Sequence, residues 1–328
     1  MKRVPVTLLT GFLGAGKTTL LQHLLDARPG LRFAVIENEF GDVGFDGSLM
    51  EGKCAALFEL NDGCICCSVR QDLIAVFEQL IGGLPMLDHI IIETTGLADP
   101  GPVMRIFDLP QMRAALVLDG VVTVVDAAHI QASLNDVAAC LEQIAYADVL
   151  ILNKVDRVQR DTLGSLKLRL RELNPLAAIQ LAEFGQVDVE LLLDLGGRPL
   201  EERVPGELHE AEQHHEHRHD EAIQPVVLEL AGEVDVHALD LWLADITRQA
   251  DSSVLRMKGI LAVPGDPRRF VFNGVRDLID VRPDRPWNEE TRFSRIVMIG
   301  RSLDLASLQA GFQSCAAASA KAAGPTAP

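Results

Sequence analysis

A glycine-rich segment near the start of the chain has the residue types and spacing of a phosphate-binding loop. Residues 11–18 read GFLGAGKT, which matches the pattern G-x-x-x-x-G-K-[ST]. In such a loop, glycines let backbone N–H groups approach phosphate oxygens, the lysine reaches the β- and γ-phosphates, and the threonine hydroxyl binds Mg²⁺. A glycine-rich turn without a ligand is the alternative, but a β-rich run precedes the segment and a one-sided helical pattern follows it. We therefore predict a nucleotide site formed by Gly11, Gly14, Ala15, Gly16, Lys17, Thr18 and Thr19, with Lys17 and Thr18 also serving catalysis.

A second short pattern concerns the nucleotide base. Asn153, Lys154 and Asp156 form the sequence NKVD at the end of the apolar run DVLILN. An aspartate carboxylate there accepts two hydrogen bonds from guanine N1–H and N2–H₂, a donor pair that adenine lacks. The lysine stem can pack against the face of the base. Four residues are weak on their own, since a strand followed by a surface turn reads the same, but together with the phosphate-binding loop they favour GTP over ATP.

An acidic residue ends another buried run. The segment HIIIE closes with Glu93 and is followed by two threonines and Gly96. P-loop enzymes need an acid at this place to hold Mg²⁺, usually through water, or to polarise the attacking water, and the glycine N–H can contact the γ-phosphate. Aspartate is the commoner acid, and a solvated glutamate at a strand end is the alternative. We predict a catalytic role for Glu93 and a nucleotide contact for Gly96.

Three cysteines within four residues indicate metal or thiol chemistry. The segment GCICC contains Cys64, Cys66 and Cys67, and thiolates are soft ligands that suit Zn²⁺, Cu(I) and, less tightly, Co²⁺ or Ni²⁺. Such a cluster cannot easily close a tetrahedral shell alone, which favours an open or transferable site. A redox pair or buried small residues are the alternatives. The acidic segment ENEFGD offers further metal or Mg²⁺ ligands in Glu37, Glu39 and Asp42, although it also reads as a solvated turn.

Histidines gather in one polar segment. Five of the nine histidines lie within eleven residues and alternate with acidic side chains. Imidazoles at this density form a flexible accessory metal site, and the alternative is a polar linker with accidental histidines. The five residues are His209, His214, His215, His217 and His219.

The elements that must position these residues alternate between strand and helix. Six β-rich runs, VPVTLLT, RFAVIE, HIIIET, VVTVVDA, DVLILN and AAIQLA, are separated by helical patterns. Strands this apolar need cover on both faces, so we predict an α/β fold: a three-layer P-loop domain with a mainly parallel sheet over residues 1–195. A flexible histidine-rich linker is expected over residues 196–224, a smaller α+β domain over 225–313 and a disordered tail over 314–328.

Charge and composition exclude several classes of function. The 328 residues carry 30 basic and 47 acidic side chains, a net charge of −17, and only 5% are aromatic. A protein that binds nucleic acid through a basic face or through stacked aromatics is therefore not expected. No apolar run approaches the length of a membrane helix, and we expect a cytoplasmic protein.

The order of the motifs resembles that of the CobW-type P-loop GTPases, and within them the YjiA branch. The motifs that carry this resemblance are, in order, TLLTGFLGAGKTTLL, AVIENEFG, GCICC, IIIETTGLADPGP and NKVD. The segments VLRMKGILAV, RFVFNGV and DRPWNEE resemble the CobW C-terminal domain, so the resemblance spans roughly residues 4–313. It implies a metallochaperone or metal insertase in which GTP binding and hydrolysis gate the transfer of Zn²⁺ or a neighbouring metal to a client protein. By the same resemblance, Cys64, Cys66 and Cys67 bind the metal, with Glu37 as a candidate partner.

Two other functions remain open on the sequence. A small-molecule kinase on the same fold would need an acceptor substrate and would leave the cysteines unexplained. A non-enzymatic zinc store or sensor would use GTP as a structural ligand. The residues show no arginine finger, so we expect slow hydrolysis. An oligomer is possible, and the client is not identified.

Overall fold

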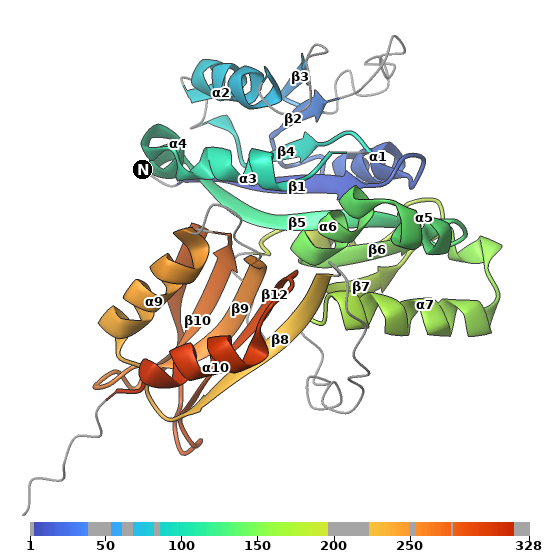
Figure 1. Cartoon of the computed structure of the whole chain (residues 1–328). Helices are drawn as coiled ribbons and strands as arrows, with labels where there is room; N and C mark the ends of the chain where they lie inside the picture. Colours follow the sequence, from blue (N-terminus) through green and yellow to red (C-terminus); the bar gives the residue numbers. More distant parts are fainter. Residues whose placement is uncertain are drawn as a thin grey trace, which may run out of the picture. The chain divides into compact units, whose positions relative to one another are not determined.

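The structure is a computed structural model that describes residues 3–38, 54–60, 68–81, 86–96, 98–195, 223–248, 254–276 and 278–317. It divides into two compact units, residues 1–219 and 220–328. Figure 1 shows both units.

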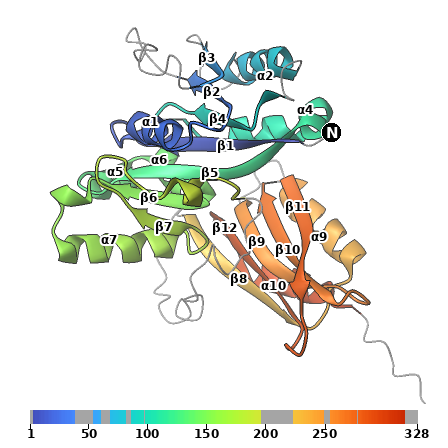
Figure 2. The same ribbon diagram turned by 180° about the vertical axis from the view of Figure 1, so that it is seen from behind.

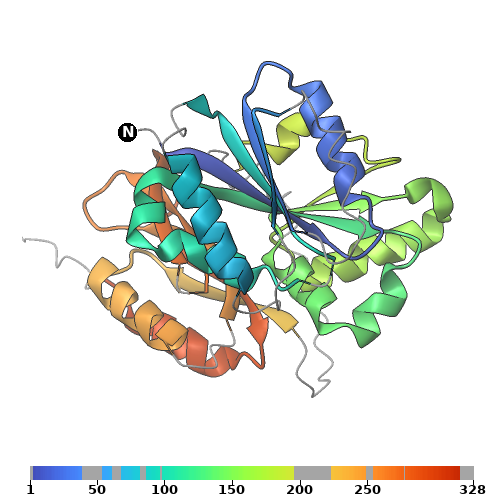
Figure 3. The same cartoon turned by 90° about the horizontal axis from the view of Figure 1, so that it is seen from above.

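The first unit is built on a parallel sheet of seven strands in the order β3-β2-β4-β1-β5-β6-β7. Every residue of β4 and β6 is buried, as expected for parallel strands covered on both faces. Figure 3 shows the strands from above. Their bounds are β1 Val4–Gly11, β2 Phe33–Asn38, β3 Ala56–Leu60, β4 His89–Glu93, β5 Leu116–Asp126, β6 Val149–Asn153 and β7 Ala178–Leu181.

Helices cover both faces of this sheet. Strand β6 shows the two cores: Val149 and Ile151 pack with the leucines of α1, while Leu150 and Leu152 pack with α6 and α7. This alternation follows from the period of two in a strand. The predicted three-layer α/β domain is thus confirmed. The helices are α1 Lys17–Ala27, α2 Ser68–Ile81, α3 Gly101–Met104, α4 Pro110–Ala115, α5 Ile130–Asp136, α6 Ala138–Tyr146 and α7 Arg160–Leu173, with short 3-10 turns at Arg105–Asp108, Val155–Arg157 and Val189–Leu192.

The second unit is an antiparallel sheet with two helices on one face, which Figure 2 shows from behind. Its strands follow the order β11-β10-β9-β12-β8, and Trp242 of α9 and Phe312 of α10 meet over the sheet with ring centroids 5.8 Å apart. The predicted α+β domain is confirmed. The bounds are β8 Ile223–Ala231, α9 Val236–Arg248, β9 Val254–Ala262, β10 Arg268–Val275, β11 Leu278–Pro286, β12 Phe293–Arg301 and α10 Leu305–Ser314.

Two strands are absent from the sequence prediction. Strand β3 is only five residues long, and β11 contains two prolines and several charged residues, LIDVRPDRP. Both lie at the edge of their sheets, where short length and proline are tolerated and the hydrophobic pattern is weak. The predicted linker over 196–224 falls outside the described residues as far as residue 222, and β8 begins at Ile223.

The prediction that the tail begins at residue 314 was wrong. Cys315 is 1% exposed, and its carbonyl oxygen accepts a hydrogen bond of 2.8 Å from the N–H of Asp235. Ala316 pairs with Val234 in an isolated bridge, and Ala317 N–H donates to Glu233 O at 2.9 Å. These backbone bonds have no signature in the alanine-rich sequence, so the composition alone could not show that the domain continues to this point.

Strand β4 begins with a buried histidine that makes stability depend on pH. His89 Nε2 lies 2.8 Å from Thr7 Oγ1, and burial lowers the pKa of His89 from 6.5 to about 4. The unfolded chain therefore takes up this proton first as the pH falls, so stability is lost between about pH 6.5 and pH 4. We expect His89 to account for a loss of up to ~3 kcal/mol over that range. Urea unfolding at several pH values should show a shallower dependence for His89→Gln; parallel curves for the two proteins would contradict the assignment.

Candidate functional site

The phosphate-binding loop joins β1 to α1 as the sequence predicts. Gly16 precedes the helix with φ of 104°, and a Cβ at this position would lie 2.4 Å from Asn153 Nδ2. Only glycine combines this backbone conformation with so close an approach. Lys17 is 9% exposed, and its Nζ donates to the carbonyl of Gly11 at 3.0 Å. The ammonium group therefore lies over the loop in which the phosphates would bind.

A hydroxyl and a carboxylate meet beside this loop. Strand β4 pairs with β1 so that Glu93 lies opposite Leu9. Thr18 Oγ1 donates to Glu93 Oε1 at 3.0 Å, and Glu93 is 4% exposed. Mg²⁺ prefers oxygen ligands of this kind. Thr18 and Glu93, which the sequence predicts as Mg²⁺ ligands, therefore lie side by side, and their hydroxyl and carboxylate oxygens are the groups that Mg²⁺ prefers.

Gly96 lies directly against the phosphate-binding loop. A Cβ on Gly96 would lie 2.5 Å from Leu13 N. From the other side, Gln143 of α6 holds the segment, because its Nε2 donates to Gly96 O at 3.2 Å and to Ala98 O at 3.1 Å. Gln143 is 1% exposed, and sequence reasoning missed it, since nothing local distinguishes it from any other helical glutamine.

The close approach of Gly96 yields a sharp test. Gly96→Ala should displace the segment from the loop and lower the rate of GTP hydrolysis by at least about tenfold, because near-attack geometry is lost over distances of about 1 Å. Gly164→Ala is the matched control: a Cβ there meets nothing within 4 Å, so α7 should be unchanged or slightly more stable. Phosphate release by both variants is the measurement, and equal rates would contradict a role for Gly96.

The NKVD segment connects three parts of the site. Asn153 ends β6 and is 2% exposed; its Nδ2 donates to Ala15 O at 2.9 Å, and its Oδ1 accepts from Gly185 N–H at 3.0 Å. It therefore fixes the phosphate-binding loop against the turn that follows β7. The backbone of Thr19 also lies there, with its carbonyl carbon 3.2 Å from a Cβ built on Gly185.

Lys154 has the left-handed φ of 61° and reaches across the site. Its Nζ donates to Gly14 O and to Asp126 Oδ2, both at 2.7 Å. Asp156 follows in the 3-10 turn Val155–Arg157 and stays accessible, with 31% of its side chain exposed. All the sequence-predicted nucleotide residues thus lie along the carboxyl-terminal edge of the sheet.

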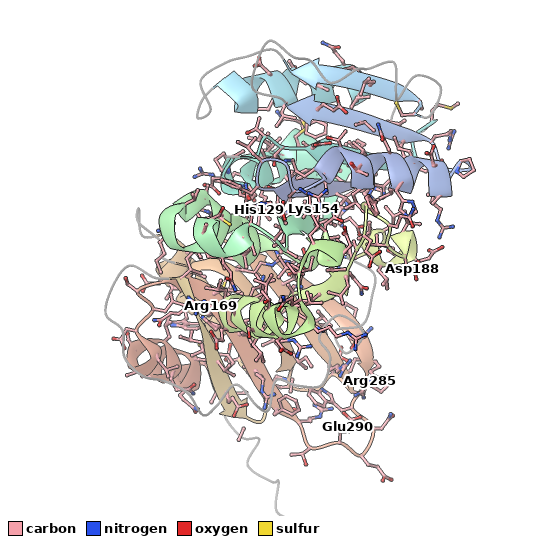
Figure 4. All side chains as sticks on the ribbon, turned by 90° about the vertical axis from the view of Figure 1, so that its right-hand side faces the viewer. His129, Lys154, Arg169, Asp188, Arg285 and Glu290 are labelled. Carbon is pink, nitrogen blue, oxygen red and sulfur yellow. The ribbon has the colours of Figure 1, made fainter. Side chains whose placement is uncertain are left out.

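Asp126 is a site residue that sequence reasoning missed. It ends β5 as Glu93 ends β4, so the rule that identified one strand-end acid could have found the other. Figure 4 shows His129 beside Lys154, and Asp126 contacts both: His129 Nδ1 lies 3.0 Å from Asp126 Oδ2. Burial raises the pKa of Asp126, but hydrogen bonds from Lys154, His129 and the N–H of Ala128 outweigh it and hold the pKa below its ordinary value.

Of the predicted metal ligands, only Glu37 lies within the described residues. It is 4% exposed near the end of β2, and its strand register pairs it with Glu93. Among the side chains that the structure describes, no group of three histidine, cysteine or acidic residues is arranged to hold a metal. The remaining predicted ligands fall outside the described part of the chain: Cys64, Cys66, Cys67, Glu39, Asp42, His209, His214, His215, His217 and His219.

Comparison with known proteins identifies this arrangement. Residues 5–180 match the nucleotide-binding domain of the CobW/HypB/UreG family, and residues 223–316 match the cobalamin synthesis protein CobW C-terminal domain. The chain belongs to the CobW family. The resemblance in sequence motifs is confirmed, and this member of the CobW family is a P-loop GTPase.

Curated relatives and solved structures of the CobW family cover nearly the whole chain. The zinc chaperone YjiA of Escherichia coli strain K12 is 36% identical over 95% of this chain and 98% of its own. The zinc-regulated GTPase metalloprotein activator 1 of Schizosaccharomyces pombe is 32% identical over 92% of this chain and 83% of its own. The crystal structure of Zn(II)-bound YjiA GTPase from E. coli has a TM-score of 0.73 at 31% identity and covers 97% of this chain and 100% of its own. The crystal structure of a Zn(II)-bound E37A, C66A, C67A triple mutant of YjiA has the same TM-score at 32% identity and covers 96% of this chain and 99% of its own.

Among the described helices, none is both long and apolar enough to cross a membrane.

Proposed function

We propose that this GTPase is a metallochaperone, which binds Zn²⁺ or the related Co²⁺ or Ni²⁺ at Cys64, Cys66 and Cys67 and delivers it to a client protein under the control of GTP. The names of its relatives support the proposal, since they are zinc chaperones or zinc-regulated activators of metalloproteins. The chain also has glutamate at 37 and cysteine at 66 and 67, the residue types and numbers replaced in the YjiA triple mutant.

The observation that carries the proposal is the pairing of Glu37 with Glu93 on neighbouring strands. Parallel strands lie about 4.8 Å apart, and paired residues point to the same face. Both glutamates are 4% exposed, so charge at one is felt strongly at the other. A cation held by either carboxylate therefore changes the free energy of binding a cation at the other, which is the requirement for coupling between nucleotide and metal.

In the hydrolysis step, Thr18 and Glu93 would hold Mg²⁺, which neutralises charge on the β- and γ-phosphates when it is bound. Lys17 would exchange its bond with the Gly11 carbonyl for the same phosphates. Gly96, held against Leu13, would present its N–H at the γ-phosphate. Loss of that phosphate would then be felt at Glu93 and, through the strand register, at Glu37.

Chelator competition for Zn²⁺ tests this coupling. The measurement is the zinc affinity of the full chain with a non-hydrolysable GTP analogue, with GDP and without nucleotide. A typical coupling of ~1–3 kcal/mol predicts affinities that differ by roughly 5- to 150-fold between the GTP and GDP states. Glu37→Ala should reduce this ratio more than it weakens nucleotide binding.

Glu172→Ala on the exposed face of α7 is the control, and it should leave the ratio unchanged. Equal zinc affinities in all three nucleotide states would contradict nucleotide-controlled delivery. Co²⁺ titration locates the metal: its thiolate charge-transfer band should disappear when Cys66 and Cys67 are both replaced by serine.

Phosphate release also separates the two competing functions. A small-molecule kinase would need an acceptor for turnover and would ignore zinc, whereas a zinc store would bind metal without turnover. Release of phosphate from GTP without an acceptor, at a rate that zinc alters, is expected for the metallochaperone.

A further inference from the structure

The turn that follows β7 presents an aromatic side chain that the fold does not use. Phe184 is 68% exposed, although burying a phenylalanine side chain contributes about 1.5–3 kcal/mol to stability. It lies between Glu183 and Gly185, next to the turn residue that bonds Asn153. Neither the packing of the sheet nor the proposed metal transfer explains an exposed ring at this place.

The backbone of this turn is also unfavourable for phenylalanine. Phe184 and Gly185 have φ of 53° and 71°, and Gln186 N–H donates to Glu183 O at 3.0 Å. Two successive positive φ angles are typical of a type I′ turn, whose first central position favours asparagine, aspartate or glycine. A residue with a Cβ in the left-handed region costs roughly 1–2 kcal/mol. The sequence therefore keeps a large ring where local structure prefers a small polar residue.

Three contacts fix the turn to the base end of the nucleotide site. Gly185 N–H donates to Asn153 Oδ1 at 3.0 Å, and Val155 N–H donates to Ala182 O at 3.3 Å. Gly185 also packs so closely on the start of α1 that a Cβ would lie 3.0 Å from Leu20 N. The turn cannot move away from the NKVD segment without breaking these contacts, so Phe184 is held near it.

A purine held at its edge by Asp156 leaves two flat faces to be covered. The stem of Lys154 is stretched across the site, because its Nζ is bound to both Gly14 O and Asp126 Oδ2. We propose that Phe184 is a base-stacking residue, whose ring covers the face of the guanine that Lys154 leaves open. The proposal rests on GTP binding at the Asn153–Asp156 edge and does not depend on metal transfer.

Stacking makes a distinctive prediction, because an aromatic ring carries no hydrogen-bond information. Replacing a stacking aromatic residue with alanine lowers the affinity for a nucleotide by roughly 5- to 150-fold, whichever base is bound. Phe184→Ala should therefore lower the affinities for GDP and ADP by the same factor and leave the ratio of the two affinities unchanged. It should raise KM for GTP with little change in kcat, since a ring over the base binds ground state and transition state alike.

The experiment is calorimetric titration of Mg·GDP and Mg·ADP into the full chain and its variants. Phe184→Trp should retain affinity within about threefold, and Leu168→Ala, which removes an exposed side chain from α7, should have no effect. Phe184→Asn is the decisive variant. It should lose affinity as the alanine variant does, yet raise the melting temperature without nucleotide, because asparagine suits the turn.

Opposite changes in affinity and stability support stacking, because replacing a side chain that served only the fold would not lower nucleotide affinity while it raised the melting temperature. Wild-type affinity in Phe184→Ala would overturn the proposal. So would a lower melting temperature with unchanged affinity in Phe184→Asn. Failure of the metal proposal would appear in the zinc competition and would leave these titrations as predicted.

Discussion

Replacing Lys17 with alanine is expected to abolish measurable GTP hydrolysis, with a loss of at least ~10²–10³ in kcat. The ammonium group lies over the phosphate-binding loop, 3.0 Å from Gly11 O, and it is only 9% exposed. It is therefore a preorganised positive charge at the place where the β- and γ-phosphates would lie. Its removal leaves the developing negative charge without its main side-chain partner, and neutral water cannot replace the ammonium charge.

Single-turnover phosphate release measures this loss, and Lys167→Ala on α7 is the matched control. The Lys17 variant should keep the far-ultraviolet circular dichroism of the parent, because the glycines and Asn153 position the loop independently of the lysine. A folded Lys17→Ala protein that hydrolyses GTP at the parental rate would contradict the assignment of the phosphate site.

The second large effect concerns the choice of base. Asp156→Ala should lower the preference for GDP over ADP by about 10²- to 10⁴-fold, since two hydrogen bonds to a charged group contribute ~1.5–3 kcal/mol each. Asp156 stays accessible in the 3-10 turn after β6 and so can receive the edge of a base. The same variant should leave phosphate contacts intact, and ADP affinity should change little.

Titration of both nucleotides with the parent, Asp156→Ala and Asp161→Ala decides this point. Asp161 lies in the first turn of α7, five residues away, and its loss should not affect base preference. A parent protein that binds GDP and ADP equally would remove the basis for guanine selection. An unchanged ratio in Asp156→Ala would assign the selection to another residue.

The parts of the site that the sequence predicted are those in which one short segment carries both the chemistry and the geometry. The loop at residues 11–18 and the NKVD segment each place their functional residues within a few positions of one turn, directly after an apolar run. The strand-end rule found Glu93 because its run is uniformly apolar. Asp126 also ends an apolar strand, but its role depends on Lys154, which reaches it from the end of another strand.

Other functional residues have no local signature at all. Gln143 has the pattern of an ordinary helical residue, and its role comes only from its hydrogen bonds to the segment that follows β4. Phe184 reads as the apolar end of a strand, and only the left-handed turn shows that its ring is exposed. Contacts between segments distant in the chain decide these roles, and a single sequence does not contain them.

The bonds made by Gln143 affect how the nucleotide state would be transmitted. One buried amide holds two carbonyls of the segment after β4, and the backbone oxygen of the same residue accepts from Thr123 Oγ1 at 2.8 Å. Since water does not reach Gln143, the segment cannot slide by small steps that exchange one partner for solvent. A displacement of the segment must break these carbonyl bonds or carry α6 with it. The segment should therefore respond to the γ-phosphate by switching between two discrete positions. A partial response would then reflect the fraction of time that the segment spends in each position, and not a partly displaced segment.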